Sequence, residues 1–192
     1  HFFDRLGKEQ GFKARIITAS SCVTIPGFDY QRIAEWAHKP CLAQIAQAER
    51  YLPEATMIFL AVYWSWQFDS PKFNDVLNEF LAQQNAAGKK VYLMEQEPLL
   101  DKNPQRALRF KALGLHPEVA LSHKYKEANT RLNAYAEKYP AITSLNFEQT
   151  GFFANTPFHQ EELLYLDEHH LNEVGAAKYS EVAGDAFKKI MD

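Results

Sequence analysis

The sequence predicts an α/β fold in which a parallel sheet lies between two layers of helices. Apolar runs of strand length alternate along the chain with longer segments that have helical spacing. The runs are continuous rather than alternating, which is typical of strands covered on both faces. A length of 192 residues, of which 46% are hydrophobic, suits a single domain over residues 1–192 with a sizeable core.

Four segments have the composition of strands, because they are short, apolar and rich in β-branched or aromatic side chains. They are residues 14–18 (ARIIT), 57–64 (MIFLAVYW), 90–94 (KVYLM) and 141–145 (AITSL). The second is the longest unbroken apolar run. It is far shorter than the roughly 20 residues that a membrane-spanning helix needs.

Five segments are expected to be helices: residues 3–10, 33–51, 73–85, 125–139 and 171–191. Their alternation with the strands predicts parallel pairing, because parallel strands need a crossover connection. The buried stripe of the last helix is expected to consist of Leu171, Val174, Val182, Ala186 and Ile190.

The chain begins with a predicted helix, whereas doubly wound domains usually open with a strand that becomes central in the sheet. We therefore expect the sequence given to lack its first strand, together with part of a site at the carboxyl ends of the strands. His1 to Asp4 has neither the basic start nor the apolar region of a signal peptide. An export signal or membrane anchor is thus expected outside these residues.

The charge is balanced, with 21 basic residues, 24 acidic residues and a net charge of −3. No long run of either sign is present, which argues against nucleic acid or anionic lipid as a partner.

Cys22 and Cys41 enclose a loop-like segment and have two interpretations that the spacing does not separate. As a disulfide in an oxidising compartment, the pair would stabilise the fold by about 3 kcal/mol. As independent residues, they would be two buried thiols. No pattern typical of a zinc site is present.

The segment 164–176 (LYLDEHHLNEVGA) carries the most chemical content. Asp167 precedes His170 by three residues in a loop that enters a helix, so its carboxylate can bind one imidazole nitrogen and leave the other for a serine hydroxyl. The alternative is that Asp167 caps the last helix. A metal site of His159, His169 and His170 is disfavoured, because adjacent histidines point in different directions.

Residues 165–176 resemble the last block of the SGNH hydrolases, in the form found in SGNH domains fused to the membrane acyltransferase-3 proteins that O-acetylate bacterial surface polysaccharides and lipopolysaccharide. Weaker landmarks occur in the same order. They are residues 20–22 (SSC), Cys41 at the place of a second cysteine, and residues 59–65 (FLAVYWS) at the end of a strand.

The resemblance implies a three-layer α/β/α sandwich with a flavodoxin-like parallel sheet, lacking its first strand here. It implies that Asp167 and His170 are two members of a Ser-His-Asp triad. Their serine is expected upstream of residue 1, in a Gly-Asp-Ser motif. It further implies a Cys22–Cys41 disulfide and a location in the periplasm or outside the cell, tethered to the inner membrane in the full-length protein.

Ser20, Ser21 and Trp64 are the other candidate site residues. Either serine is a conceivable nucleophile, but lining the site is the favoured role, with a backbone N–H donating to an oxyanion. Trp64 would offer its ring or N–H to a sugar, and the alternative is a core residue.

The expected function is transfer of an acetyl group to a hydroxyl of a bacterial cell-surface glycan. The acyl donor is expected to arrive through the membrane acyltransferase domain, without a metal or bound organic cofactor. Two alternatives remain: an acetyl-esterase, in which water replaces the sugar, and a non-catalytic glycan-binding domain.

Overall fold

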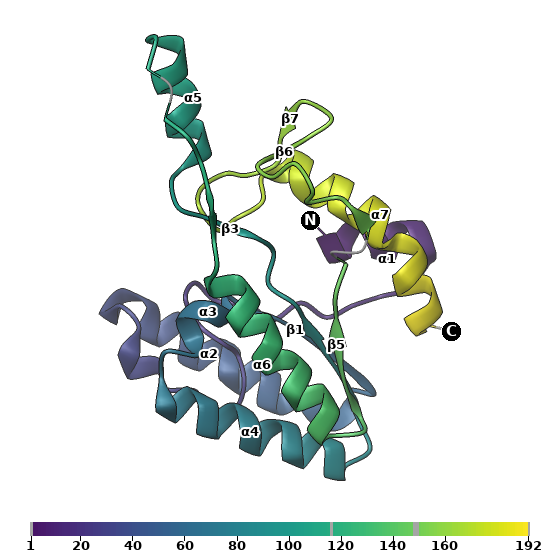
Figure 1. Cartoon of the computed structure of the whole chain (residues 1–192). Helices are drawn as coiled ribbons and strands as arrows, with labels where there is room; N and C mark the ends of the chain where they lie inside the picture. The colour runs from purple at the N-terminus through teal and green to yellow at the C-terminus, as the bar shows by residue number, and fades with distance from the viewer. Residues whose placement is uncertain (1, 116, 148–149, 192) are drawn as a thin grey trace. The chain divides into compact units, whose positions relative to one another are not determined.

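The computed structural model describes residues 2–115, 117–147 and 150–191 (Figure 1). The chain divides into two compact units. The sheet unit contains residues 15–96 and 126–145, and the terminal unit contains residues 1–14, 97–125 and 146–192. No helix among the described residues has the length and apolar character needed to cross a bilayer.

The sheet unit is built on three parallel strands in the order β1-β2-β5. They are β1 (Met57–Ala61), β2 (Lys90–Met94) and β5 (Ile142–Leu145). Val91 pairs with Ile58 on one side and with Ile142 on the other. The sheet confirms the predicted α/β class with parallel pairing.

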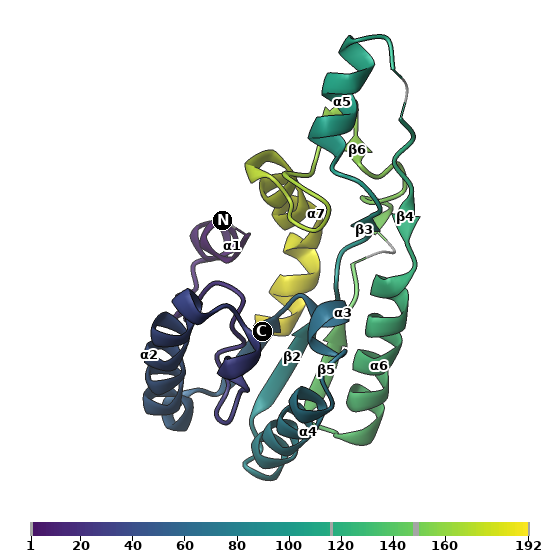
Figure 2. The same cartoon turned by 90° about the vertical axis from the view of Figure 1, so that its left-hand side faces the viewer.

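Helices precede and connect these strands (Figures 1 and 2), and two short 3-10 turns flank the first long helix. The helices are α2 (Glu35–Tyr51), α3 (Trp64–Gln67), α4 (Pro71–Ala86) and α6 (Lys124–Lys138), and the turns are η1 (Tyr30–Arg32) and η2 (Leu52–Glu54). Ser70 caps α4 by accepting the backbone N–H of Phe73 at 3.2 Å, and Pro71 occupies the first turn, where its missing N–H costs nothing.

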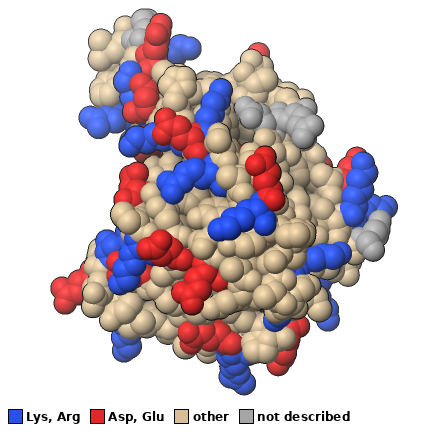
Figure 3. Space-filling model, turned by 60° about the horizontal axis from the view of Figure 1, so that its bottom comes forward, with Lys and Arg blue, Asp and Glu red and all other residues tan. Residues whose placement is uncertain are grey.

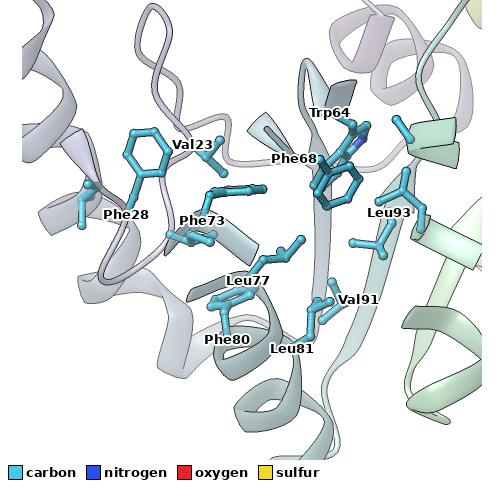
Figure 4. Close-up of a cluster of buried hydrophobic side chains, with 14 of the residues drawn as sticks. Val23, Phe28, Trp64, Phe68, Phe73, Leu77, Phe80, Leu81, Val91 and Leu93 are labelled. Carbon is cyan, nitrogen blue, oxygen red and sulfur yellow. The ribbon is translucent and has the colours of Figure 1, made fainter. Parts of the chain in front are cut away.

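The core of the sheet unit lies where these helices meet the sheet. Buried side chains of α4 at helical spacing, Phe73, Leu77 and Leu81, belong to one cluster with Val91 and Leu93 of β2 (Figure 4). The periodicity that predicted the helix is thus the periodicity of its buried face.

Within the described residues of the terminal unit, the chain forms three α-helices and two small antiparallel ribbons. The helices are α1 (Phe2–Gln10), α5 (Pro104–Ala112) and α7 (Glu173–Met191). The ribbons pair β3 (Leu99–Leu100) with β4 (Leu121–Ser122), and β6 (Phe158–His159) with β7 (Glu162–Leu163).

Residues 14–18, predicted to be a strand, do not form one. Just after this segment, Ala19 and Cys22 form an isolated antiparallel bridge. Ile16 is 59% exposed, and the carbonyl of Ile17 accepts the hydroxyl of Thr24 at 3.0 Å rather than a ladder N–H. A β-rich composition needs a neighbouring strand to become a ladder, and this segment has none among the described residues.

The predicted stripe of the last helix is also wrong. The buried residues of α7 include Gly175, Tyr179, Ala183 and Phe187, whereas Val182 is 36% exposed. Tyr179 and Phe187 pack with Phe147 at ring-centroid distances of 5.7 and 5.6 Å. The aromatic residues therefore define the inner face, and Val174 and Val182 of the predicted stripe are exposed.

The predicted run 57–64 ends as a strand at Ala61. The backbone N–H of Trp64 donates to the carbonyl of Val62 at 2.9 Å, and the chain enters α3.

Basic and acidic side chains are interspersed on the face of the molecule in Figure 3.

Candidate active site

Residues 164–172 form a tightly closed loop before α7, which we call the Asp-His loop. Tyr165 and Leu171 form an isolated antiparallel bridge, and the N–H of Leu166 donates to the carbonyl of His170 at 2.8 Å. The buried ring of Tyr165 anchors the loop, and its hydroxyl donates to the carbonyl of Pro98 at 2.8 Å. Burial raises the pKa of this hydroxyl, which therefore remains a donor.

Asn172 joins the Asp-His loop to α7. Its Oδ1 accepts the N–H of Gly175 at 2.7 Å, and its Nδ2 donates to the carbonyl of Leu163 at 2.7 Å. Gly175 lies against the loop so closely that an added Cβ would be 2.2 Å from the carbonyl oxygen of Leu164. Asn172 is therefore the residue that caps α7, in place of the Asp167 cap considered as an alternative.

Asp167 instead binds the loop itself. Its Oδ1 accepts the backbone N–H groups of His169 at 2.9 Å and of His170 at 2.7 Å, and its Oδ2 lies 2.8 Å from Nδ1 of His170. With Nδ1 donating to the carboxylate, the lone pair of a neutral imidazole is on Nε2. The side chain of His170 is 62% exposed, so Nε2 is accessible to a reacting hydroxyl.

The carboxylate of Asp167 is held in its charged form. Its partial burial alone would raise its pKa, but the hydrogen bonds from the His170 ring and from the N–H groups of His169 and His170 outweigh burial and leave the pKa below its ordinary value. A charged carboxylate at this place can stabilise an imidazolium.

His169 lies beside this pair but is less exposed, at 31% of its side chain. Burial lowers its pKa against the opposing effect of Asp167. Ligand atoms of Asp167, His169 and His170 lie within 4.8 Å of one another, so these three residues could together hold a metal ion. His159 lies in β6, where Nδ1 is 3.2 Å from the carbonyl of Phe152 and the ring packs on that phenyl group.

The sequence matches a known protein family over most of its length. Residues 1–183 match the model of the SGNH domain that is fused to AT3 domains. The chain belongs to this SGNH family. Among curated proteins no match is found.

Solved structures include one with the same fold as this SGNH domain. It is the periplasmic domain of the lipopolysaccharide acetyltransferase of Salmonella ser. Paratyphi A, with a TM-score of 0.60. The two chains are 12% identical, and the match covers 100% of this chain and 78% of the other.

The other predicted site residues of the SGNH domain belong to the sheet unit. Ser20 and Ser21 are exposed in a tight turn, in which the N–H of Cys22 donates to the carbonyl of Ala19 at 3.2 Å. Ser21 has a φ of 59°, in the left-handed region. The turn leaves both serines on the surface.

Trp64 does not fit the predicted contact with a sugar. The residue is fully buried in the core, and its indole N–H donates to the carbonyl of Met94 at 2.7 Å. The core interpretation, weighed as the alternative, is the one that the structure bears out.

Cys22 and Cys41 form a disulfide with an S–S distance of 2.02 Å. This confirms the pairing that the family resemblance implied. Cys41 is fully buried in α2, so the bond fixes the segment after residue 18 to a helix of the core.

Sequence reasoning missed Glu97, an acidic residue near the imidazole. Burial raises the pKa of Glu97, opposed by its own backbone N–H and by His170. Its position was the available signal, because Glu97 follows β2 at its carboxyl end, where parallel sheets place their sites.

Proposed function

We propose that this SGNH domain transfers an acetyl group to a hydroxyl of a bacterial cell-surface glycan, through a Ser-His-Asp triad that includes Asp167 and His170. The observation that carries the proposal is the 2.8 Å contact between Oδ2 of Asp167 and Nδ1 of a His170 side chain that is 62% exposed. Membership in a family fused to AT3 domains supports acyl transfer, and so does the fold of a lipopolysaccharide acetyltransferase domain.

In the first step His170 acts as the base. Its Nε2 takes the proton of a serine hydroxyl while the serine oxygen attacks the acetyl carbonyl, and Asp167 stabilises the imidazolium that forms. The imidazolium then gives the proton to the leaving group of the donor. The product of this step is an acetyl-serine, with His170 neutral again.

In the second step the glycan is the nucleophile. Nε2 of His170 takes the proton of a sugar hydroxyl, whose oxygen attacks the acetyl-serine, and the proton returns to the serine oxygen when the ester bond breaks. The backbone N–H groups at Ser20 and Ser21 are the proposed donors to the oxyanion of both tetrahedral intermediates. The nucleophilic serine is proposed to precede His1 in the natural protein.

The proposed setting is the periplasmic side of the inner membrane. There an AT3 domain of the same protein would supply the acyl donor. The Cys22–Cys41 disulfide supports an oxidising compartment, because cytosolic reductants keep most thiols reduced.

A comparison of neighbouring histidines tests the mechanism in the natural full-length protein. His170→Ala is expected to lower turnover by about 10³ to 10⁶, because the general base is lost. Asp167→Asn is expected to lower turnover with little change in KM, because it removes the positioning carboxylate. The measurement is kcat for acetyl-glycan formation, with free acetate measured in parallel.

His169→Ala is the matched control, since it removes an adjacent imidazole and should change turnover little. Equal losses for the two histidine variants would contradict the assignment. A fluorophosphonate probe is expected to label a serine upstream of His1, and labelling of Ser20 or Ser21 would refute that position. If free acetate is the sole product, the domain is an esterase and not a transferase.

A further inference from the structure

A hollow of about 530 Å³ lies beside the Asp-His loop, within the range of roughly 300–1,000 Å³ typical of small-ligand sites. One wall is α5 with its ends, and the other is Glu168, two residues before His170. The residues that line it include Asn103, Arg106, Arg109, Phe110, Leu113 and Glu168. A ligand in the hollow would therefore lie next to the loop that carries the imidazole.

The α5 wall presents side chains to solvent rather than to a core. Pro104 is the only buried residue of this helix, which stands at the top of Figures 1 and 2. Leu113, just after the helix, is 75% exposed. The helix is thus kept in place by its ends rather than by a buried stripe.

Two arginines of α5 line the hollow without an acidic partner. Arg106 and Arg109 are three residues apart and therefore share a helix face. In the part of the chain that the structure describes, neither forms an ion pair, and Arg106 lies 5.5 Å from the centroid of the Phe110 ring. With Glu168 as the carboxylate of the lining, the hollow carries an excess of one positive charge.

The two walls are fixed to each other through the main chain. The N–H of Leu100 donates to the carbonyl of Glu168 at 2.9 Å, which ties β3 to the Asp-His loop. Four residues later α5 begins, capped by Asn103, whose Oδ1 accepts the N–H of Arg106 at 3.0 Å. The start of α5 is therefore only four residues from a main-chain contact with the Asp-His loop.

The chemistry of the lining favours one kind of ligand. A guanidinium binds a carboxylate or phosphate through two parallel hydrogen bonds. Glu168 can accept hydrogen bonds from hydroxyl groups, and Phe110 offers a flat apolar surface. Together these groups suit a sugar that carries an acidic substituent.

We propose that the hollow binds a carboxylate or phosphate group of the acceptor glycan through Arg106 and Arg109. This inference rests on the proposed function, and it adds that the acceptor is an acidic glycan. With the acidic group bound by the arginines, the rest of the glycan would lie next to Glu168 and the Asp-His loop.

Calorimetric titration of the full-length protein at low ionic strength tests the proposal with three probes. They are methyl β-D-glucuronide, glucose 6-phosphate and the neutral methyl β-D-glucoside. At least one acidic probe should bind about tenfold or more tightly than the neutral one, and added salt should reduce the difference. The two acidic probes distinguish a carboxylate from a phosphate.

Substitutions in α5 test which residues bind the acidic probe. The double variant Arg106→Gln/Arg109→Gln should lower affinity for the acidic probe about tenfold or more and leave affinity for the neutral probe unchanged. Arg106→Lys should lose part of the affinity, because lysine keeps the charge but lacks the planar fork. Lys111→Gln is the matched control on the same helix, since Lys111 does not line the hollow.

Equal affinity for acidic and neutral probes would overturn the proposal, as would an effect of Lys111→Gln as large as that of the arginine variants. If phosphatidylglycerol vesicles bind through the arginines and neither acidic sugar binds, the hollow contacts lipid and the glycan proposal is wrong. Because titration needs no turnover, acid-selective binding in a protein that fails the His170 test would refute only the transferase.

Discussion

At the scale of single residues, the carboxylate of Asp167 binds both the imidazole of His170 and the main chain of the Asp-His loop. Three residues separate Asp167 from His170, and the predicted hydrogen bond between their side chains is present at 2.8 Å. The same spacing could not show that Oδ1 also accepts two backbone N–H groups of the loop. Glu97 and His170 are far apart in the sequence. Only the fold brings the carboxyl group of Glu97 near the imidazole.

Glu97→Gln should change the pH dependence of stability. Because burial raises the pKa of Glu97 above its ordinary 4.5, the folded state binds the proton more tightly than the unfolded state does. The free energy of unfolding should therefore fall as the pH rises through the window above 4.5, and the variant should lose this decline.

Urea unfolding of both proteins from about pH 4 to pH 8 measures the effect. Asp167 contributes with the opposite sign, since its lowered pKa gives stability that is lost as the pH falls. Parallel profiles for the two proteins would rule out a perturbed Glu97.

At the scale of elements, local periodicity located the long helices but not always their buried faces. Residues 171–191 were predicted as a helix, and α7 runs from Glu173 to Met191. The predicted stripe was wrong because it was chosen from aliphatic residues alone. The larger side chains of Tyr179 and Phe187 occupy the buried face instead. The helix α5 was not predicted, since its nine residues carry no buried stripe to detect.

Gly175→Ala should destabilise the protein by about 1–3 kcal/mol or more, because the new Cβ meets the backbone carbonyl of Leu164, which no side-chain rotation can relieve. The better helix propensity of alanine, up to about 1 kcal/mol, is too small to compensate. Thermal and urea unfolding give the change in the free energy of unfolding.

Gly184→Ala is the matched control on the same helix, since its nearest neighbour is Nε2 of Gln10 at an ordinary 3.6 Å. This variant should be neutral or more stable by about 0.5–1 kcal/mol. A Gly175 variant as stable as the Gly184 variant would show that the loop does not press on α7.

At the scale of the whole molecule, the sequence predicted the class of the fold but not how distant segments combine. The terminal unit is assembled from three separate segments of the chain. Its ends meet where Arg5 pairs with Glu181 and where Gln10 donates to the carbonyl of Gly184 at 2.5 Å. Such contacts leave no periodic signal in either segment.

Reduction of the Cys22–Cys41 bond should lower the free energy of unfolding by about 3 kcal/mol, because the bond closes a loop between residues 19 apart. Urea unfolding with and without dithiothreitol measures the difference. The double variant Cys22→Ser/Cys41→Ser should be weakened similarly and should not respond to reductant. Identical unfolding of the wild-type protein under both conditions would show that the bond contributes no stability.

The hydrogen bond from Leu100 to Glu168 has a consequence for how such a domain diversifies. It joins main chain to main chain, so substitution of either side chain leaves donor and acceptor in place. Mutations can therefore change the side chains of α5 while the Asp-His loop keeps this contact. With the proposed roles of α5 and His170, acceptor selectivity and acyl transfer can evolve separately, and exchanging residues 103–113 between relatives is a direct test of that separation.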